Sequence, residues 1–264
     1  MSQRITAKNL ELVITKNREI ASEIDDYVNV VWKEHNPNKI TSSPQLAFDI
    51  LYRYGLIQTP IEDPIWSGAI FVRNGKKIPA INSAMPRANQ YFTAWHEVYH
   101  LLFDRVSFDH MIGADTFVEE RKAEYFASQM LLGDVFLYFC NLNEMDFESK
   151  IFYCMSLYGA PYKAVLISLY DEAVNKGIND VRDEVVNCFD RHYTDLPEKF
   201  QRLGLDDSIV RPSFVINPGI AAMRMEDAAA ENEEVTYHNS HKGFMLRTLG
   251  EIRELAEGQD VQNS

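Results

Sequence analysis

The sequence predicts an α+β fold in which one small twisted sheet is joined to a mostly helical remainder. Two patterns indicate this class. Residues 66–82 alternate in part between apolar and polar side chains on either side of Asn74-Gly75, a pair typical of hairpin turns. Much of the remaining chain carries apolar residues three and four positions apart, which is the spacing of one helix face. At 264 residues, of which 46% are hydrophobic, the chain can bury one generous core with room for a small second unit.

Two helices are expected before the hairpin. Residues 14–35 place apolar side chains at helical intervals with charged residues between them. This spacing predicts an amphipathic helix that packs on the main body, and a partner-binding helix is the alternative. Ser43 suits the N-cap and Pro44 the first turn of a second helix over residues 45–54, which Gly55 ends.

The returning half of the hairpin, residues 76–82, contains Pro79. Because proline has no N–H to donate to a ladder, this returning strand is expected to keep one free edge. An extended peptide can add to a free edge as one more strand, which would hold its backbone beside the following helix. An ordinary edge strand, protected by Pro79, Lys76 and Lys77, is the alternative.

The segment Trp95-His96-Glu97-Val98-Tyr99-His100 carries the clearest chemical pattern in the chain. It is predicted to be helical, because apolar residues recur on one side at Phe92, Trp95, Tyr99 and Leu102. The other side carries Thr93, His96, Glu97 and His100. Two imidazoles four residues apart can hold one Zn²⁺, and Glu97 can take a proton from metal-bound water. Two structural histidines on a buried helix are the alternative, so the pattern needs a third ligand.

The third ligand is expected from a neighbouring element. A metzincin would carry glycine at position 103 and histidine at position 106, but Phe103 and Val106 stand there, which excludes that class. His110 is the nearest downstream histidine, and it lies in a stretch with loop character.

A helix predicted over residues 116–132 offers better candidates. Glu120 and Glu124 fall on the same face as the apolar stripe of Ala123, Ala127, Met130 and Leu131, whereas Glu119 falls nearer the flank. A carboxylate on an apolar face needs a partner, which is either a metal ion or a basic side chain.

These motifs together resemble the ImmA/IrrE family of zinc metallopeptidases. The matching segments are residues 68–72, 78–82, 92–102 and 120–127, and the match covers about residues 44 to 175. They follow the family's order of strand, strand, "FTLAHELGHLLLH" and "E-x-x-A-N-x-F-A-A-x-L-L". The resemblance implies that His96, His100 and Glu120 bind zinc, that Glu97 is the general base, and that Glu124 stands behind the zinc ligands. The chain departs from the family pattern at Tyr99, commonly glycine, and at Glu124, usually asparagine or aspartate.

The resemblance also implies a zincin-like fold and zinc-dependent hydrolysis of a specific protein, such as a helix-turn-helix repressor. A zinc-containing regulator that binds a repressor or toxin without cutting it is one alternative, and a zinc hydrolase of a non-peptide bond is another. A hydrolase of this kind needs a group that steadies the oxyanion. The candidates are Tyr125, Tyr158, His192 and Tyr193, among which the sequence does not choose.

Composition excludes several other classes. A net charge of −13 and a pI near 5.0 argue against direct nucleic-acid binding. The three widely spaced cysteines, Cys140, Cys154 and Cys188, suggest reduced thiols and form no CxxC pair. No segment has the apolar length of a signal peptide or a membrane span, so a cytoplasmic protein without membrane contact is expected.

The remaining chain is expected to be mainly helical. Residues 146–157 and 161–174 are arranged like a helix-turn-helix, but Lys150, Lys163 and Lys176 are its only basic residues, so we interpret the pair as core structure. Further along, the pattern indicates helices over 135–140, 177–190, 200–205 and 245–255, a strand over 209–216, a solvated acidic segment at 231–234 and a frayed tail over 257–264.

Three parts of the chain are therefore expected. A helical extension over residues 1–43 precedes the zinc domain over 44–190, and residues 191–264 form a C-terminal extension that could select the partner. His238 and His241 are three residues apart but have no third ligand in register, so surface histidines are expected there.

Overall fold

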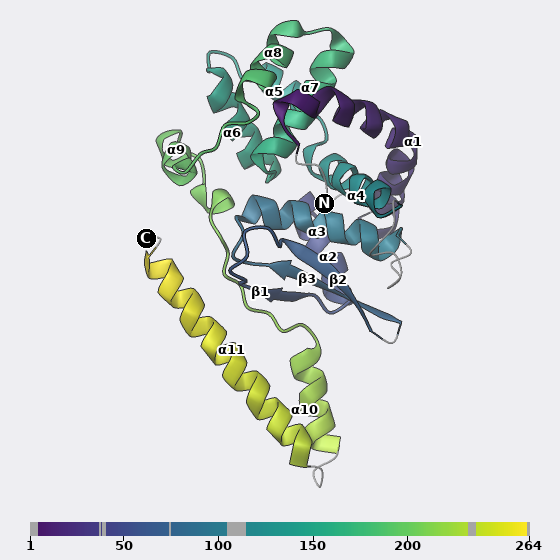
Figure 1. Ribbon diagram of the computed structural model, residues 1–264, viewed down its shortest axis with the longest axis vertical. Helices are drawn as coiled ribbons and strands as arrows, with labels where there is room; N and C mark the ends of the chain where they lie inside the picture. Colours follow the sequence, from purple (N-terminus) through teal and green to yellow (C-terminus); the bar gives the residue numbers. More distant parts are fainter. Residues whose placement is uncertain are drawn as a thin grey trace.

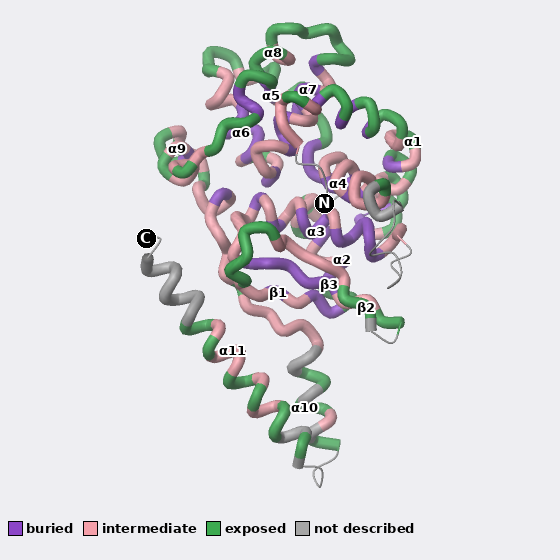
Figure 2. Tube along the Cα trace, in the orientation of Figure 1, coloured by how far each residue is buried: buried purple, intermediate pink, exposed green. Residues whose placement is uncertain are grey.

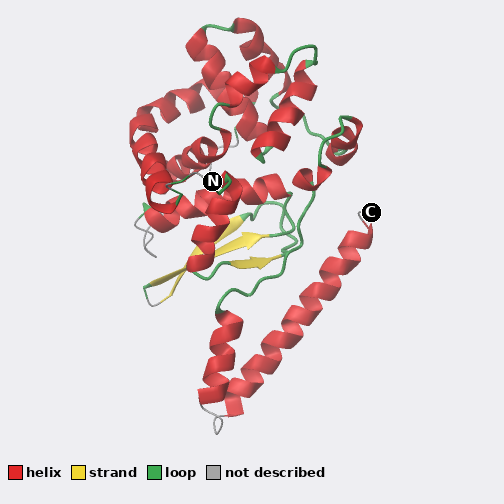
Figure 3. Ribbon diagram, turned by 180° about the vertical axis from the view of Figure 1, so that it is seen from behind, coloured by secondary structure: helices red, strands yellow, loops and turns green. Residues whose placement is uncertain are grey.

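The computed structural model describes residues 5–36, 38, 41–73, 75–104, 115–231 and 236–262. The chain has a mixed α+β fold with one small sheet, which confirms the predicted class in this coarse form. In Figure 1 the sheet lies under helix α3, and most other helices lie on the far side of α3 from the sheet. Two C-terminal helices project away from this body (Figures 1 and 3). His110, Asn74 and the acidic residues 232–234 lie outside the described residues.

The helices account for most of the chain. They are α1 (Leu10–His35), α2 (Ser43–Arg53), α3 (Arg87–Leu102), α4 (Asp115–Leu132), α5 (Val135–Asn141), α6 (Phe147–Tyr158), α7 (Tyr162–Lys176), α8 (Asn179–Cys188), α9 (Leu196–Arg202), α10 (Ala221–Glu231) and α11 (Thr236–Gln262), with 3₁₀ turns η1 (Ala7–Asn9) and η3 (Asp207–Val210). The helices predicted up to residue 190 are confirmed, with ends that shift by a few residues. Such shifts are normal, because helix ends are weakly specified by local sequence.

The sheet has three strands in the order β1-β3-β2, where β1 is Ile57–Thr59, β2 is Gly68–Arg73 and β3 is Lys76–Asn82. The predicted hairpin is confirmed, because β2 and β3 pair antiparallel over their whole length. The predicted free edge on β3 is confirmed only in part: β3 is the central strand, but β1 pairs only with its last three residues, so residues 76–79 pair with no described strand on that side and the longer free edge belongs to β2. Pro79 is tolerated there since it precedes Ala80, where the parallel pairing with β1 begins.

Helix α3 is buried on both sides, between the other helices and the sheet (Figure 2). Trp95 and Tyr99 are buried among helices and stack edge-on or tilted against Phe126 of α4. The opposite face, expected to be polar, is also buried, because the sheet covers it at Thr93 and Glu97. A buried polar face next to a sheet requires partners for its side chains.

Ser43 has a different role from the predicted one. The N-cap of α2 is Ser42, one residue earlier. The Ser43 hydroxyl instead donates to the carbonyl oxygen of Met130 in α4 and accepts from the indole N–H of Trp95, at 3.0 Å. Ser43 therefore joins α2, α3 and α4 behind the face of α3 that carries the histidines.

The chain after residue 190 departs most from expectation. The predicted strand over 209–216 is wrong, since η3 occupies its start and the rest makes only the single bridge Pro86↔Pro212; a second bridge, Gln58↔Asn217, follows it. Pro212 and Pro218 remove the N–H groups that a longer ladder would need. The short helix predicted at 200–205 begins earlier, as α9, and the predicted frayed tail is helical to Gln262 within α11.

The segment between α8 and α10 packs on the main body. Phe200 is fully buried and Val210 is nearly so, both within the main core. A domain boundary at residue 190 remains a prediction, but the packing itself continues past it. By contrast, α10 and α11 contact each other and expose Met223, Phe244 and Leu246.

Candidate metal centre

His96 and His100 from α3 and Glu120 from α4 meet at one point. The two Nε2 atoms are 3.1 Å apart, and the Glu120 carboxylate lies 3.3 Å from Nε2 of His96 and 3.6 Å from Nε2 of His100. Four ligands at 2.0–2.1 Å around a tetrahedral Zn²⁺ would lie about 3.3–3.4 Å from one another. These three groups are therefore close enough to bind one metal ion, with all candidate ligand atoms within 4.8 Å of one another. Among the described residues, this is the group of three potential metal ligands whose atoms lie that close together.

Packing between α3 and α4 produces this meeting. The small side chains of Ala123 and Ala127 are fully buried, which lets the two helices approach closely. Tyr99 strengthens the contact from α3, because its ring packs on Phe126 and its hydroxyl donates to Glu119. Tyr99, which stands where the family commonly has glycine, therefore joins the two helices.

Glu119 and Glu120 are separated by these contacts. The Glu119 carboxylate accepts from Tyr99 and pairs with Lys122 at 3.2 Å. Lys122 also pairs with Glu23 of α1 at 2.9 Å. Glu119 is thus committed to holding α1, α3 and α4 together, which leaves Glu120 as the carboxylate beside the histidines.

The charges show that the site favours a cation. Burial lowers the pKa of His96, but its hydrogen bond with Glu120 and the carboxylates of Glu97 and Glu124 outweigh that effect and raise it. The pKa of Glu120 is lowered by the same hydrogen bond. Burial and the neighbouring His96 lower the pKa of His100, which favours its neutral, metal-binding form.

Glu97 lies beside this triad in a closed environment. Its side chain is 4% exposed, and burial raises its pKa to about 7, against a smaller lowering by His96. The backbone of β2 passes directly over it at Gly68. A Cβ added at Gly68 would lie 3.0 Å from Glu97 Oε1 and 2.6 Å from Thr93 Cγ2. Glycine therefore allows the free-edge strand to begin next to Glu97.

Two residues that the sequence did not single out for this role complete the site. The Asp104 carboxylate lies 2.8 Å from Nδ1 of His100, which leaves Nε2 of that ring directed at the triad. Lys77 of β3 donates to the carbonyl oxygens of His100, Leu101 and Asp104 at 3.0–3.1 Å. Asp104 could have been noticed from its spacing of four residues after His100. Lys77 could not, because its contact depends on how the sheet packs on α3.

The remaining candidate residues lie further from the triad. Glu124 makes no hydrogen bond or ion pair with a described residue, but its carboxylate interacts electrostatically with His96, and it lines a cavity together with Tyr125. Tyr158 packs on Tyr138, Tyr193 packs on Phe152 and Tyr162, and His192 is exposed. None of these contacts reaches the triad, so their predicted oxyanion role remains a prediction. His241 is exposed, as expected.

Comparison with protein-family models, curated proteins and solved structures found no match. The resemblance to the ImmA/IrrE family therefore rests on the motifs themselves. In the part of the chain that the structure describes, no helix is long and apolar enough to cross a membrane.

Proposed function

We propose that this protein is a zinc-dependent endopeptidase with a zincin-like active site. The observation that carries the proposal is the convergence of His96, His100 and Glu120 beside the buried carboxylate of Glu97. Three protein ligands of this type leave one coordination position open, which is typical of catalytic rather than structural zinc sites. The resemblance to the ImmA/IrrE family leads to the same ligand set and the same general base.

Each residue of the site has a separate role in the proposed hydrolysis. Bound zinc would polarise a carbonyl and lower the pKa of a water molecule. Glu97 is positioned to take the proton of that water and to return it to the leaving amine. Burial raises the pKa of Glu97, which makes its carboxylate a stronger proton acceptor than an exposed glutamate. Asp104 holds the ring of His100, and Lys77 holds the end of α3 against the sheet.

The free edge of β2 supplies a place for the substrate backbone. An extended peptide can pair with this edge and gain main-chain hydrogen bonds without any particular sequence. Since β2 begins at Gly68 beside Glu97, a peptide on this edge would pass close to the general base. A protein substrate fits this arrangement, and the family resemblance favours a helix-turn-helix repressor. The test is whether the zinc-loaded chain cuts peptides in a manner that depends on Glu97.

Replacing Asp104 by alanine is expected to weaken zinc binding by ~10–100-fold. The carboxylate orients His100 through Nδ1, so its loss frees the ring to turn away from the metal. Zinc affinity would be measured by competition with a chromophoric chelator. Asp26→Ala is the control. It removes the same negative charge from an exposed position on α1, away from the site. Unchanged affinity in Asp104→Ala would show that the contact does not hold the ligand.

Removal of residues 221–264 is expected to leave a folded, zinc-loaded peptidase that cuts short peptides but fails on an intact protein substrate. The cut falls after Ile220 because Ile220 packs on Gly55, while Phe200 and Val210 belong to the core. The deleted helices expose apolar residues such as Phe244, which suits a partner contact. Circular dichroism, zinc content and the two kinds of cleavage would be compared with the full chain. Equal cleavage of the intact substrate would exclude a role in partner selection.

A further inference from the structure

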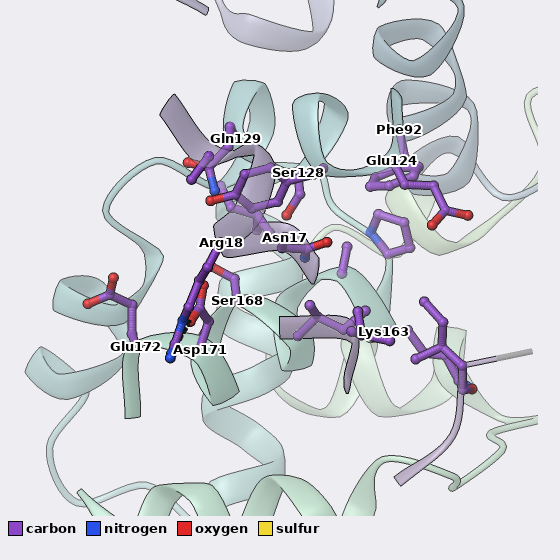
Figure 4. A pocket seen from close by; sticks show the side chains of 18 of the residues that line it. Asn17, Arg18, Phe92, Glu124, Ser128, Gln129, Lys163, Ser168, Asp171 and Glu172 are labelled. Atoms are coloured by element: carbon purple, nitrogen blue, oxygen red, sulfur yellow. Dashed lines mark hydrogen bonds and ion pairs between the residues drawn. The ribbon is translucent and has the colours of Figure 1, made fainter. Parts of the chain in front are cut away.

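A cavity of about 520 Å³ lies between α1, α4 and α7, with the N-terminal half of α3 as a further wall (Figure 4). Pockets of about 300–1,000 Å³ are typical of small-ligand and side-chain binding. The cavity is separate from the three metal-binding residues, none of which lines it.

The cavity nevertheless begins one helical turn from the metal centre on two helices. Glu124 follows Glu120 by four residues on α4, and Phe92 precedes His96 by four residues on α3; both line the cavity. Four residues of helix advance about 6 Å. An extended peptide advances about 3.3–3.6 Å per residue, so a residue next to a bond at the metal could direct its side chain into this space.

Asn17 marks the cavity as a place for a polar group. Its side chain is 6% exposed, it lines the cavity, and no hydrogen bond joins it to any described residue. Figure 4 shows it between Glu124 and Phe92 on one side and Arg18 with Asp171 on the other. Its amide is therefore available to a polar group that enters the cavity.

The charges around the cavity favour a cation. Its two basic side chains are engaged already: Arg18 pairs with Asp171 at 2.7 Å, and Lys163 donates to the carbonyl oxygen of Ile5 at 2.9 Å. Two acidic side chains, Glu124 and Asp25, have no ion pair with any described residue. The free charge on the lining is therefore negative.

The remaining lining is mixed. Its apolar part includes Phe92, Leu132 and Ile167, and its polar part includes Ser128, Gln129 and Ser168. A long aliphatic stem could pack on the apolar side chains while its charged end reaches Asn17 or a carboxylate. Lysine and arginine have this combination of apolar stem and charged head.

We infer that this cavity receives the basic side chain of the substrate residue next to the bond that is cut. The inference rests on the proposed peptidase activity and adds a substrate preference to it. Asn17 and Glu124 offer acceptors to the guanidinium or ammonium group, while the exposed Asp25, about 12 Å along α1 from Asn17, adds negative charge to the lining.

The first test uses pairs of fluorogenic peptides that differ only in arginine or norleucine at the position next to the cut. The kcat/KM value for the arginine peptide is expected to exceed that for the norleucine peptide by about tenfold or more. One well-placed charge-assisted hydrogen bond is enough for a difference of this size. Asn17→Leu, Glu124→Gln and Asp25→Asn should each move the ratio of the two values towards one. Asp26→Asn is the matched control, because it removes the same charge from the neighbouring, exposed position on α1.

The second test measures binding without cleavage. N-acetyl-arginine amide should bind the zinc-loaded protein in calorimetry, N-acetyl-norleucine amide should not, and Asn17→Leu should lose the arginine probe while keeping the fold, as checked by circular dichroism. Peptides cut with no preference for a basic residue would overturn the inference and leave the proposed function standing. If no peptide is cut, the proposed function fails, and binding of the arginine probe still decides whether the cavity takes a basic group. Equal binding of the two probes overturns the inference in every case.

Discussion

Replacing Glu97 by glutamine is expected to reduce peptide cleavage by ~10²-fold or more while the protein keeps its fold and its zinc. Glutamine has the same shape as glutamate, so the close packing with Gly68 and Thr93 is retained. Its amide cannot accept the proton that a carboxylate takes from water. The measurement is kcat/KM on a cleaved peptide together with zinc content and Tm.

The same variant separates a hydrolase from a regulator, and the kind of substrate that is cut then separates the two hydrolases. A regulator that only binds its partner would be unaffected by Glu97→Gln, since no proton transfer is involved. A hydrolase of non-peptide bonds would depend on Glu97 but would act on small amides and esters rather than on peptides. Peptide turnover by the variant that is comparable with the native chain would remove Glu97 from the mechanism.

Changing His96, His100 or Glu120 to alanine is expected to abolish stable zinc binding. The native chain should hold about one Zn²⁺, because the three side chains form a single group of ligands. With one ligand removed, the two that remain leave two positions open to water and the affinity falls steeply. Metal content after dialysis, measured on variants that are shown to be folded, tests this directly.

Glu119→Gln is the matched control for Glu120→Ala. Glu119 is adjacent in sequence but accepts from the Tyr99 hydroxyl, and glutamine can still accept that bond. Alanine would be a poorer control, because it would leave the buried Tyr99 hydroxyl without its partner. Loss of zinc from Glu119→Gln, with zinc retained by Glu120→Ala, would show that the wrong carboxylate has been assigned.

Much of this site could be predicted because its parts are local. The spacing of His96, Glu97 and His100 places all three on one short helix, and helical periodicity alone limits the partner carboxylate to Glu120 or Glu124. The same local rules correctly predict the hairpin and the helices up to residue 190. They fail at residues 209–216, where two short apolar runs resemble a strand but the prolines prevent a ladder.

The sequence by itself thus determined the metal-binding motif, the helices that carry it and the acidic, partly alternating character of the chain, because each depends on neighbours within a few residues. Only the tertiary structure decided that β3 is central, that Asp104 and Lys77 hold the end of α3, and that Asn17 faces a cavity. Strand order and side-chain partners depend on which distant segments pack together. That choice is made by the burial of α3 between the sheet and the helices, and no local pattern encodes it.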